Sequence, residues 1–247
     1  MTQEKAGLGE QALNKIAEAA LSIQLDEVDR LEVQVKTDPS KLAQGELESV
    51  TIDGDGLVMQ EDIRMEQMEM HISSIAVNPW KALMGKIQLT QPAEGTARIV
   101  LTEADISRAF NSESLNDQIR NLNIQVGGKP ITIDIQSVDC HLLSDGKLAV
   151  DAKIWLGQID DIRVVSFTGT PRISAGGQGV FVEDIHYPEG KELSPELTKV
   201  LADKASEILN LRNFEMEGVL LHIHQLDVEA GKLTLQAKAT VTQFPST

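Results

Sequence analysis

Long stretches of this sequence alternate apolar and polar residues, and the alternation slips by one residue at similar places. A period of two is typical of β-strands with one buried face. In residues 131–143 the apolar positions run Ile133 and Ile135, then Val138 and Cys140. A strand that keeps one face apolar across such a slip needs one extra residue, which is a β-bulge. Because a bulge bends its strand, this feature predicts a curved sheet.

The same slip recurs in an internal repeat. Residues 131–153 and 219–238 share an apolar pair followed by aspartate, then a turn, Gly-Lys-Leu, alternating apolar residues and Ala-Lys. In the second copy the slip falls between Ile223 and Leu226. A fainter copy, IRMEQMEMHI, slips between the first two of its methionines, Met65 and Met68. We therefore predict three bulges, one in each copy.

Strand patterns occupy most of the chain, and several exceed the average strand length of about five or six residues. They cover residues 31–35, 63–77, 131–143, 147–156, 162–168, 219–228 and 233–241. Helical patterns occur around residues 13–21, 102–110 and 194–208, and Thr102 and Ser194 are suitable N-caps for the last two. The predicted fold is α+β: a long, strongly coiled antiparallel sheet wrapped around two or three helices as a roll.

The segment TIDGDGLVMQEDIR, residues 51–64, resembles the start of a calcium-binding loop. An EF-hand loop needs oxygen ligands at its first, third and fifth positions and a glutamate at its twelfth. Counting from Asp53, the fifth residue is Leu57 and the twelfth is Arg64, so the motif fails. The two Asp-Gly pairs instead predict a strand end and a hairpin turn.

No group of residues points to catalysis, a metal or a cofactor. His222 and His224 share the polar face of a predicted strand, but two histidines do not make a metal site, so they are expected to be solvated. The glycines of residues 176–179 are expected at a mobile hairpin tip. Cys140 is the single cysteine, and we expect it in the core. The protein is therefore expected not to be an enzyme.

Charge limits the partners. A formal net charge of −16 argues against nucleic-acid binding, which depends on lysine and arginine contacts to phosphate. Such a charge also opposes attraction to an anionic membrane, so lipid contacts should be mainly apolar. The N-terminus lacks a basic region followed by a long apolar stretch, and no segment approaches a spanning helix. The chain is expected to be soluble.

Methionines gather with isoleucines between residues 59 and 84. Their flexible thioethers suit variable apolar partners, although ordinary core filling explains them as well. Trp80 lies on a short predicted helix beside Lys81, which suits an anchor at a membrane interface or, alternatively, a lid packed on the core. The candidate lipid-binding residues are Met65, Met68, Met70, Ile72, Trp80, Leu83, Met84 and Phe110.

Three segments, GELESVTIDGDGLVMQEDIRMEQMEM, VNPWKALMGKIQL and ARIVLTEADISRAFNS, resemble the LmeA-like phospholipid-binding family, which has many cyanobacterial members. The resemblance covers approximately residues 10–243. It implies a tubular lipid-binding fold, in which a coiled sheet around long helices encloses an apolar groove. It also implies phospholipid binding, with no catalytic residues to transfer.

Taken together, residues 1–247 are expected to form one LmeA-like domain that binds or handles phospholipid without catalysis. The expected partner is a phospholipid or another acyl-chain lipid, held between helices and sheet, with no cofactor. A cytoplasmic protein that contacts a membrane surface peripherally is expected, because exported relatives carry a leader and this sequence shows none. The alternative is an acidic protein–protein interaction module without bound lipid, and an enzyme acting on lipid is the third hypothesis.

Overall fold

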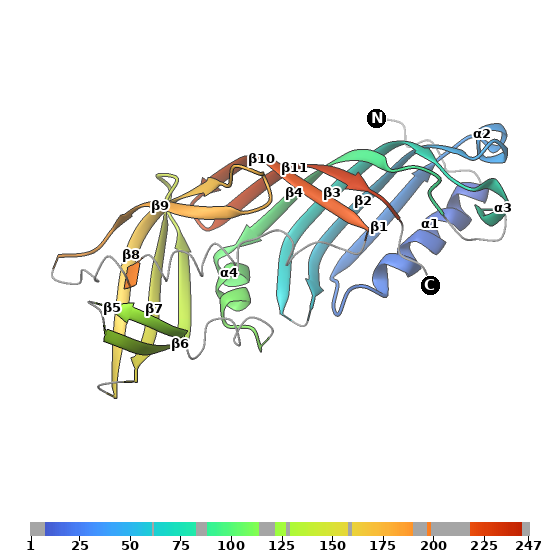
Figure 1. Ribbon diagram of the computed structural model, residues 1–247. Coiled ribbons are helices and arrows are strands. Elements are labelled where there is room, and N and C mark those ends of the chain that lie inside the picture. The colour runs from blue at the N-terminus through green and yellow to red at the C-terminus, as the bar shows by residue number, and fades with distance from the viewer. Residues whose placement is uncertain are drawn as a thin grey trace.

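The protein is an elongated assembly of two antiparallel sheets with few helices (Figure 1). A computed structural model describes residues 8–60, 62–82, 88–113, 122–126, 129–157, 160–189, 197–198 and 218–243. The helices are α1 (Leu8–Ser22), α2 (Pro39–Ala43), α3 (Pro79–Ala82) and α4 (Glu103–Phe110). The strands are β1 (Arg30–Lys36), β2 (Glu46–Met59), β3 (Ile63–Ala76), β4 (Ala93–Thr102), β5 (Leu122–Val126), β6 (Lys129–Leu142), β7 (Leu148–Leu156), β8 (Asp161–Ile173), β9 (Val180–His186), β10 (Val219–Glu229) and β11 (Lys232–Val241).

The α+β class is confirmed, but the strands form two sheets where one was expected. A six-stranded sheet has the order β1-β2-β3-β4-β11-β10, and a five-stranded sheet has the order β5-β6-β7-β8-β9. Helix α4 packs on β3 and β4 of the first sheet and on β6 of the second, so it lies where the two sheets meet (Figure 1). Among the described helices, none has the length and apolarity needed to cross a membrane.

Two of the three predicted bulges are confirmed. The pairing of β6 with β7 shifts register between Ile135 and Ser137, and that of β10 with β11 shifts between Ile223 and Gln225. These are equivalent positions of the internal repeat, and both copies are hairpins. The repeat therefore reflects one supersecondary unit used twice, once in each sheet.

The third bulge prediction, between Met65 and Met68, is wrong as a one-sided bulge. Strands β2 and β3 keep a constant register past this point. Gly56 and Glu66, which would face each other, are both missing from the ladder of paired residues. Each strand thus has one extra residue at this level. Both strands therefore change together which alternate residues are buried, and the register of their pairing stays the same. We call this the change of face. Gly56 has a φ of +61°, which suits glycine.

The hairpin turn predicted at the Asp-Gly pairs is also misplaced, because both pairs lie inside β2. The chain turns later, at Gln60, whose φ is +51°. The glycines serve close packing instead. The Leu57 side chain lies over Gly54, and a β-carbon on Gly56 would collide with the Asp29 carboxylate.

The helix at residues 13–21 is confirmed as α1, and the helix at residues 102–110 as α4. Thr102 caps α4 as predicted, in a reciprocal capping box with Asp105. The helix predicted at 194–208 lies outside the described residues apart from Leu197 and Thr198, which are helical. Cys140 is buried, which raises the pKa of its thiol to about 12, so it is a core residue.

The two histidines and the glycine-rich segment noted in the sequence lie in the expected places. His222 and His224 are exposed. The glycines of residues 176–179 form the turn between β8 and β9, and the N–H of Ile223 donates to the carbonyl of Gly177 at 2.7 Å. This hydrogen bond joins the β8–β9 turn to β10, so it links the two sheets.

Helix α1 lies along the outer edge of β1 and hydrogen-bonds to its backbone through side chains. Three residues spaced by four on the helix accept bonds from three N–H groups spaced by two, on β1 and on the residue that follows it. The pairs are Glu10 with Thr37 at 3.1 Å, Asn14 with Val35 at 2.7 Å, and Glu18 with Val33 at 3.2 Å. The spacings match, because four helical residues advance about 6 Å and two strand residues about 6.8 Å.

Helix α4 repeats this arrangement on β6. Strand β5 pairs with β6 only up to Ile133, which leaves the next part of the β6 edge to the helix. The accepting residues are again spaced by four and the N–H groups by two. The pairs are Glu103 with Leu142 at 2.6 Å, Ser107 with Cys140 at 2.9 Å, and Asn111 with Val138 at 3.0 Å. Both helices therefore cover strand edges that would otherwise be open.

Candidate lipid-binding site

The inner face of the six-stranded sheet is an unbroken apolar surface. Cross-strand pairing aligns one residue from every strand in each of two neighbouring rows. The first row is Val33, Ile52, Met70, Ala97, Ala237 and Ile223. The second is Val35, Val50, Ile72, Gly95, Ala239 and Leu221. All are buried except Gly95, which is partly buried.

Side-chain length changes in the middle of these rows. Strands β4 and β11 contribute only Gly95, Ala97, Ala237 and Ala239, which we call the small-residue strip. Longer side chains border it, from Met70 and Ile72 on β3 and from Leu221 and Ile223 on β10. The apolar surface is therefore lowest along the two central strands. Gly95 is required there, because a β-carbon would collide with the carbonyl of His71.

Charge is confined to the opposite, outer face of these strands. Glu32, Asp53, Glu69 and Arg98 follow one another across β1 to β4. Burial, then the neighbouring charges of Glu69 and Glu32, raise the pKa of Asp53. The two inner rows contain no ionisable residue, so a ligand lying on them would meet hydrocarbon only.

The predicted methionines are brought together on this face. Met68, Met70 and Ile72 alternate along β3 on the buried side, and Met65 stays buried beyond the change of face at Glu66. Phe110 is buried on α4, which packs on β3 and β4. Leu83 and Met84 lie outside the described residues. The small-residue strip was missed, because Ala and Gly do not stand out in an apolar pattern.

Trp80 is not part of the inner face. It lies on α3 with 76% of its surface exposed, so the interpretation as a lid packed on the core is wrong for this residue. The Asn78 side chain caps α3, accepting from the N–H groups of Trp80 at 3.1 Å and Lys81 at 3.2 Å. Helix α3 lies at the end of the six-stranded sheet remote from α4 (Figure 1).

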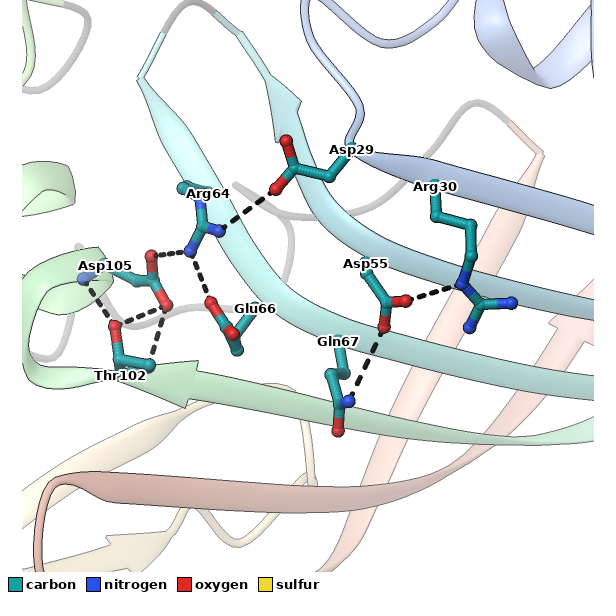
Figure 2. Close-up of polar contacts among 8 residues, drawn as sticks. All are labelled: Asp29, Arg30, Asp55, Arg64, Glu66, Gln67, Thr102 and Asp105. Atoms are coloured by element: carbon teal, nitrogen blue, oxygen red, sulfur yellow. Dashed lines mark hydrogen bonds and ion pairs between the residues drawn. The ribbon is translucent and has the colours of Figure 1, made fainter.

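A polar cluster occupies the opposite end of this sheet, where β3 meets α4. Figure 2 shows Arg64 between three carboxylates: Asp105 at 2.7 Å, Glu66 at 2.8 Å and Asp29 at 3.6 Å. Asp105 is only 3% exposed, and it also accepts from the backbone and the hydroxyl of Thr102. The hydrogen bond to Asp105 raises the pKa of Arg64, so the guanidinium stays charged.

This cluster has a structural role. Arg64 and Asp105 form an ion pair that holds α4 against β3. In the sequence, Arg64 was considered only as a calcium ligand, in the motif that fails. Across the described part of the chain, no three His, Cys, Asp or Glu side chains are placed to bind a metal ion.

Comparison with known proteins gives one family. The LmeA-like phospholipid-binding family matches residues 5–238, which is nearly the whole chain. Neither the curated proteins nor the solved structures contain a significant match. The extent of the family match, together with a mostly antiparallel fold that has an apolar inner face, leads to one assignment. The chain belongs to the LmeA-like phospholipid-binding family.

Proposed function

We propose that this single-domain protein binds phospholipid without catalysis, with the acyl chains lying along the small-residue strip. The observation that carries the proposal is the drop in side-chain height at Ala97 and Ala237, between Met70 and Ile223. A methylene chain laid there contacts apolar side chains on both sides. Burial of apolar surface stabilises such a complex by about 25 cal/mol per Å².

The distribution of charge supports the same proposal. The rows of the inner face have no ionisable residue, while the outer face carries the charge of β1 to β4. A charged head group would be strongly destabilised on the inner face, because an unpaired ion is costly to bury. The acyl chains therefore enter the site, and the head group stays at its margin in contact with water.

Mass spectrometry of lipids extracted from the purified protein tests this function. We expect stoichiometric phospholipid, and we expect lipid-free protein to take phospholipid from vesicles. A protein that is purified empty and also takes up no lipid from vesicles would contradict the proposal. The acidic interaction module without lipid would then be the better description.

We also propose that Trp80 contacts the membrane from which lipid is drawn. Its indole is exposed at one end of the molecule beside Lys81, and tryptophan is favoured at membrane interfaces. Replacing Trp80 by aspartate should weaken binding to phospholipid vesicles several-fold in a flotation assay, because it removes the main apolar contact. Ile23, which is 69% exposed at the end of α1, provides the control. An equal loss of vesicle binding in Trp80→Asp and Ile23→Asp would contradict the proposal that Trp80 contacts the membrane.

A further inference from the structure

This protein covers its strand edges with specific contacts. Helix α1 hydrogen-bonds to the edge of β1, and α4 hydrogen-bonds to the open part of β6. The β8–β9 turn covers part of β10 through the Gly177 carbonyl. Open edges present unpaired N–H and C=O groups that invite pairing with another strand, and natural proteins usually block them. An edge left open here is therefore an exception.

Such an edge exists at the first half of β8. Strand β9 pairs with β8 only from Thr168 to Ile173. Within the described ranges, no strand or helix hydrogen-bonds to the free side of residues 161–167. The remaining outer strands of this sheet are less open, because β5 has only five residues and β9 is broken by a bulge at Asp184, whose φ is +49°.

Apolar side chains are exposed beside this open edge. Ile162 and Val164 point to the outer face of the sheet with 56% and 55% of their surface exposed. Trp155 of β7, which is partly buried, lies directly opposite Ile162. On the other face, Arg163 bonds to Asp161 at 3.1 Å. Two exposed β-branched residues on an open edge are what strand pairing would bury.

We propose that residues 161–163, at the start of this open edge, pair with the same residues of a second copy of this chain, in an antiparallel dimer with two-fold symmetry. Unpaired backbone groups are complemented by another strand, whereas a lipid bilayer cannot satisfy them. The edge is also complementary to itself. With Ile162 on the two-fold axis, Ile162 faces its own copy, and Asp161 faces Arg163 of the second chain twice. Opposite charges and apolar pairs at facing positions stabilise antiparallel strands.

Sedimentation velocity of the full chain over a range of concentrations tests this pairing. We expect wild-type protein to dimerise, and Ile162→Lys to weaken the dimer about tenfold or more, because the change occurs twice in a symmetric interface. Leu220→Lys is the matched control. Leu220 is also 56% exposed, but it lies on β10 of the other sheet, so its dimer should match the wild type.

A cysteine at position 162 tests the geometry of the proposed pairing directly. Ile162→Cys should form an intermolecular disulfide under mild oxidation, whereas Leu220→Cys should not. The native Cys140 is buried and will not interfere. A wild-type protein that stays monomeric at all concentrations would overturn the dimer, as would an Ile162→Lys variant that associates normally. The lipid content of Ile162→Lys should equal that of the wild type, so this test is separate from that of lipid binding.

Fluorescence distinguishes a bilayer at the same patch. The chain has two tryptophans, so Trp80→Phe leaves Trp155 as the single reporter. In the dimer, vesicles containing bromine-labelled phospholipid should leave the emission of Trp155 unchanged. If these vesicles quench the emission of Trp155, and the emission recovers when the vesicles are removed, a membrane covers the patch. That result would overturn the proposed pairing.

Discussion

Replacing Asp105 by alanine is expected to lower the free energy of unfolding by about 3 kcal/mol or more, measured by denaturant titration. Asp105 is buried and accepts from Arg64 at 2.7 Å and from the Thr102 backbone at 2.8 Å. The substitution removes the buried one of the three carboxylates around Arg64 and half of the capping box at once. Loss of a helix cap alone costs about 1 kcal/mol, and breaking a buried ion pair costs more.

The size of this effect follows from the place of α4. This short helix packs on β3 and β4 in one sheet and on β6 in the other, so loosening it weakens the junction between the sheets. Asp62 provides the control, because it bonds to Arg108 of the same helix at 3.2 Å but is partly exposed. Asp62→Ala should cost less than about 1 kcal/mol, as exposed ion pairs do. Similar costs for the two variants would show that Asp105 has no special role.

An Asp105→Asn variant separates the two contributions. Asparagine can still accept from the Thr102 backbone through its side-chain carbonyl, but it no longer carries the charge that faces Arg64. We expect its unfolding free energy to lie between those of the wild type and Asp105→Ala. A value equal to that of Asp105→Ala would assign the whole effect to the ion pair.

Most strands could be predicted because alternation survives in their sequences. The residues predicted for β3, β7 and β11 match the observed strands within one or two residues at each end. The bulges at Ser137 and Gln225 were also predictable, because each is one extra residue in a single strand. The change of face at Gly56 and Glu66 was not, since it needs an extra residue in both partners. A single strand's pattern cannot show what its neighbour does.

Strand β4 was missed for a reason that bears on the proposed site. Its inner positions include Ala93, Gly95 and Ala97, which give little hydrophobic contrast with the polar residues between them. The residues that make the apolar surface low are therefore the same ones that hide the strand. Pairing with β11, which brings Ala97 opposite Ala237, becomes visible only in the fold.

The contacts that cover strand edges left a signal that was not recognised. Glu10, Asn14 and Glu18 are spaced by four in the first helix, as are Glu103, Ser107 and Asn111 in the second. Each set lies beside the apolar stripe of its helix, where polar residues usually contact water. Only the matching set of backbone N–H groups on a strand edge explains them, and this depends on tertiary structure. The division into two sheets was unpredictable for the same reason.

Replacing Ala237 by leucine is expected to weaken phospholipid uptake about tenfold while leaving the protein folded. Leucine fills the small-residue strip, where the acyl chain is proposed to lie, and overpacking by a few methylenes costs about 1–3 kcal/mol. If that cost falls on the lipid-bound state, about 1.4 kcal/mol gives the tenfold change. The measurement is transfer of a fluorescent phospholipid from vesicles to the purified variant.

The internal repeat supplies the control for this experiment. Ala152 of β7 corresponds to Ala237 in the repeat, and it is also buried on the inner side of its sheet, opposite Val138. Ala152→Leu overpacks the core of the other sheet, so it should lower the free energy of unfolding by about 1–3 kcal/mol, but it should leave lipid uptake intact. Equal losses of uptake in both variants would mean that general destabilisation is responsible. Unchanged uptake in Ala237→Leu would mean that acyl chains do not lie on the strip, since two leucine methyl groups could not share that space with a lipid.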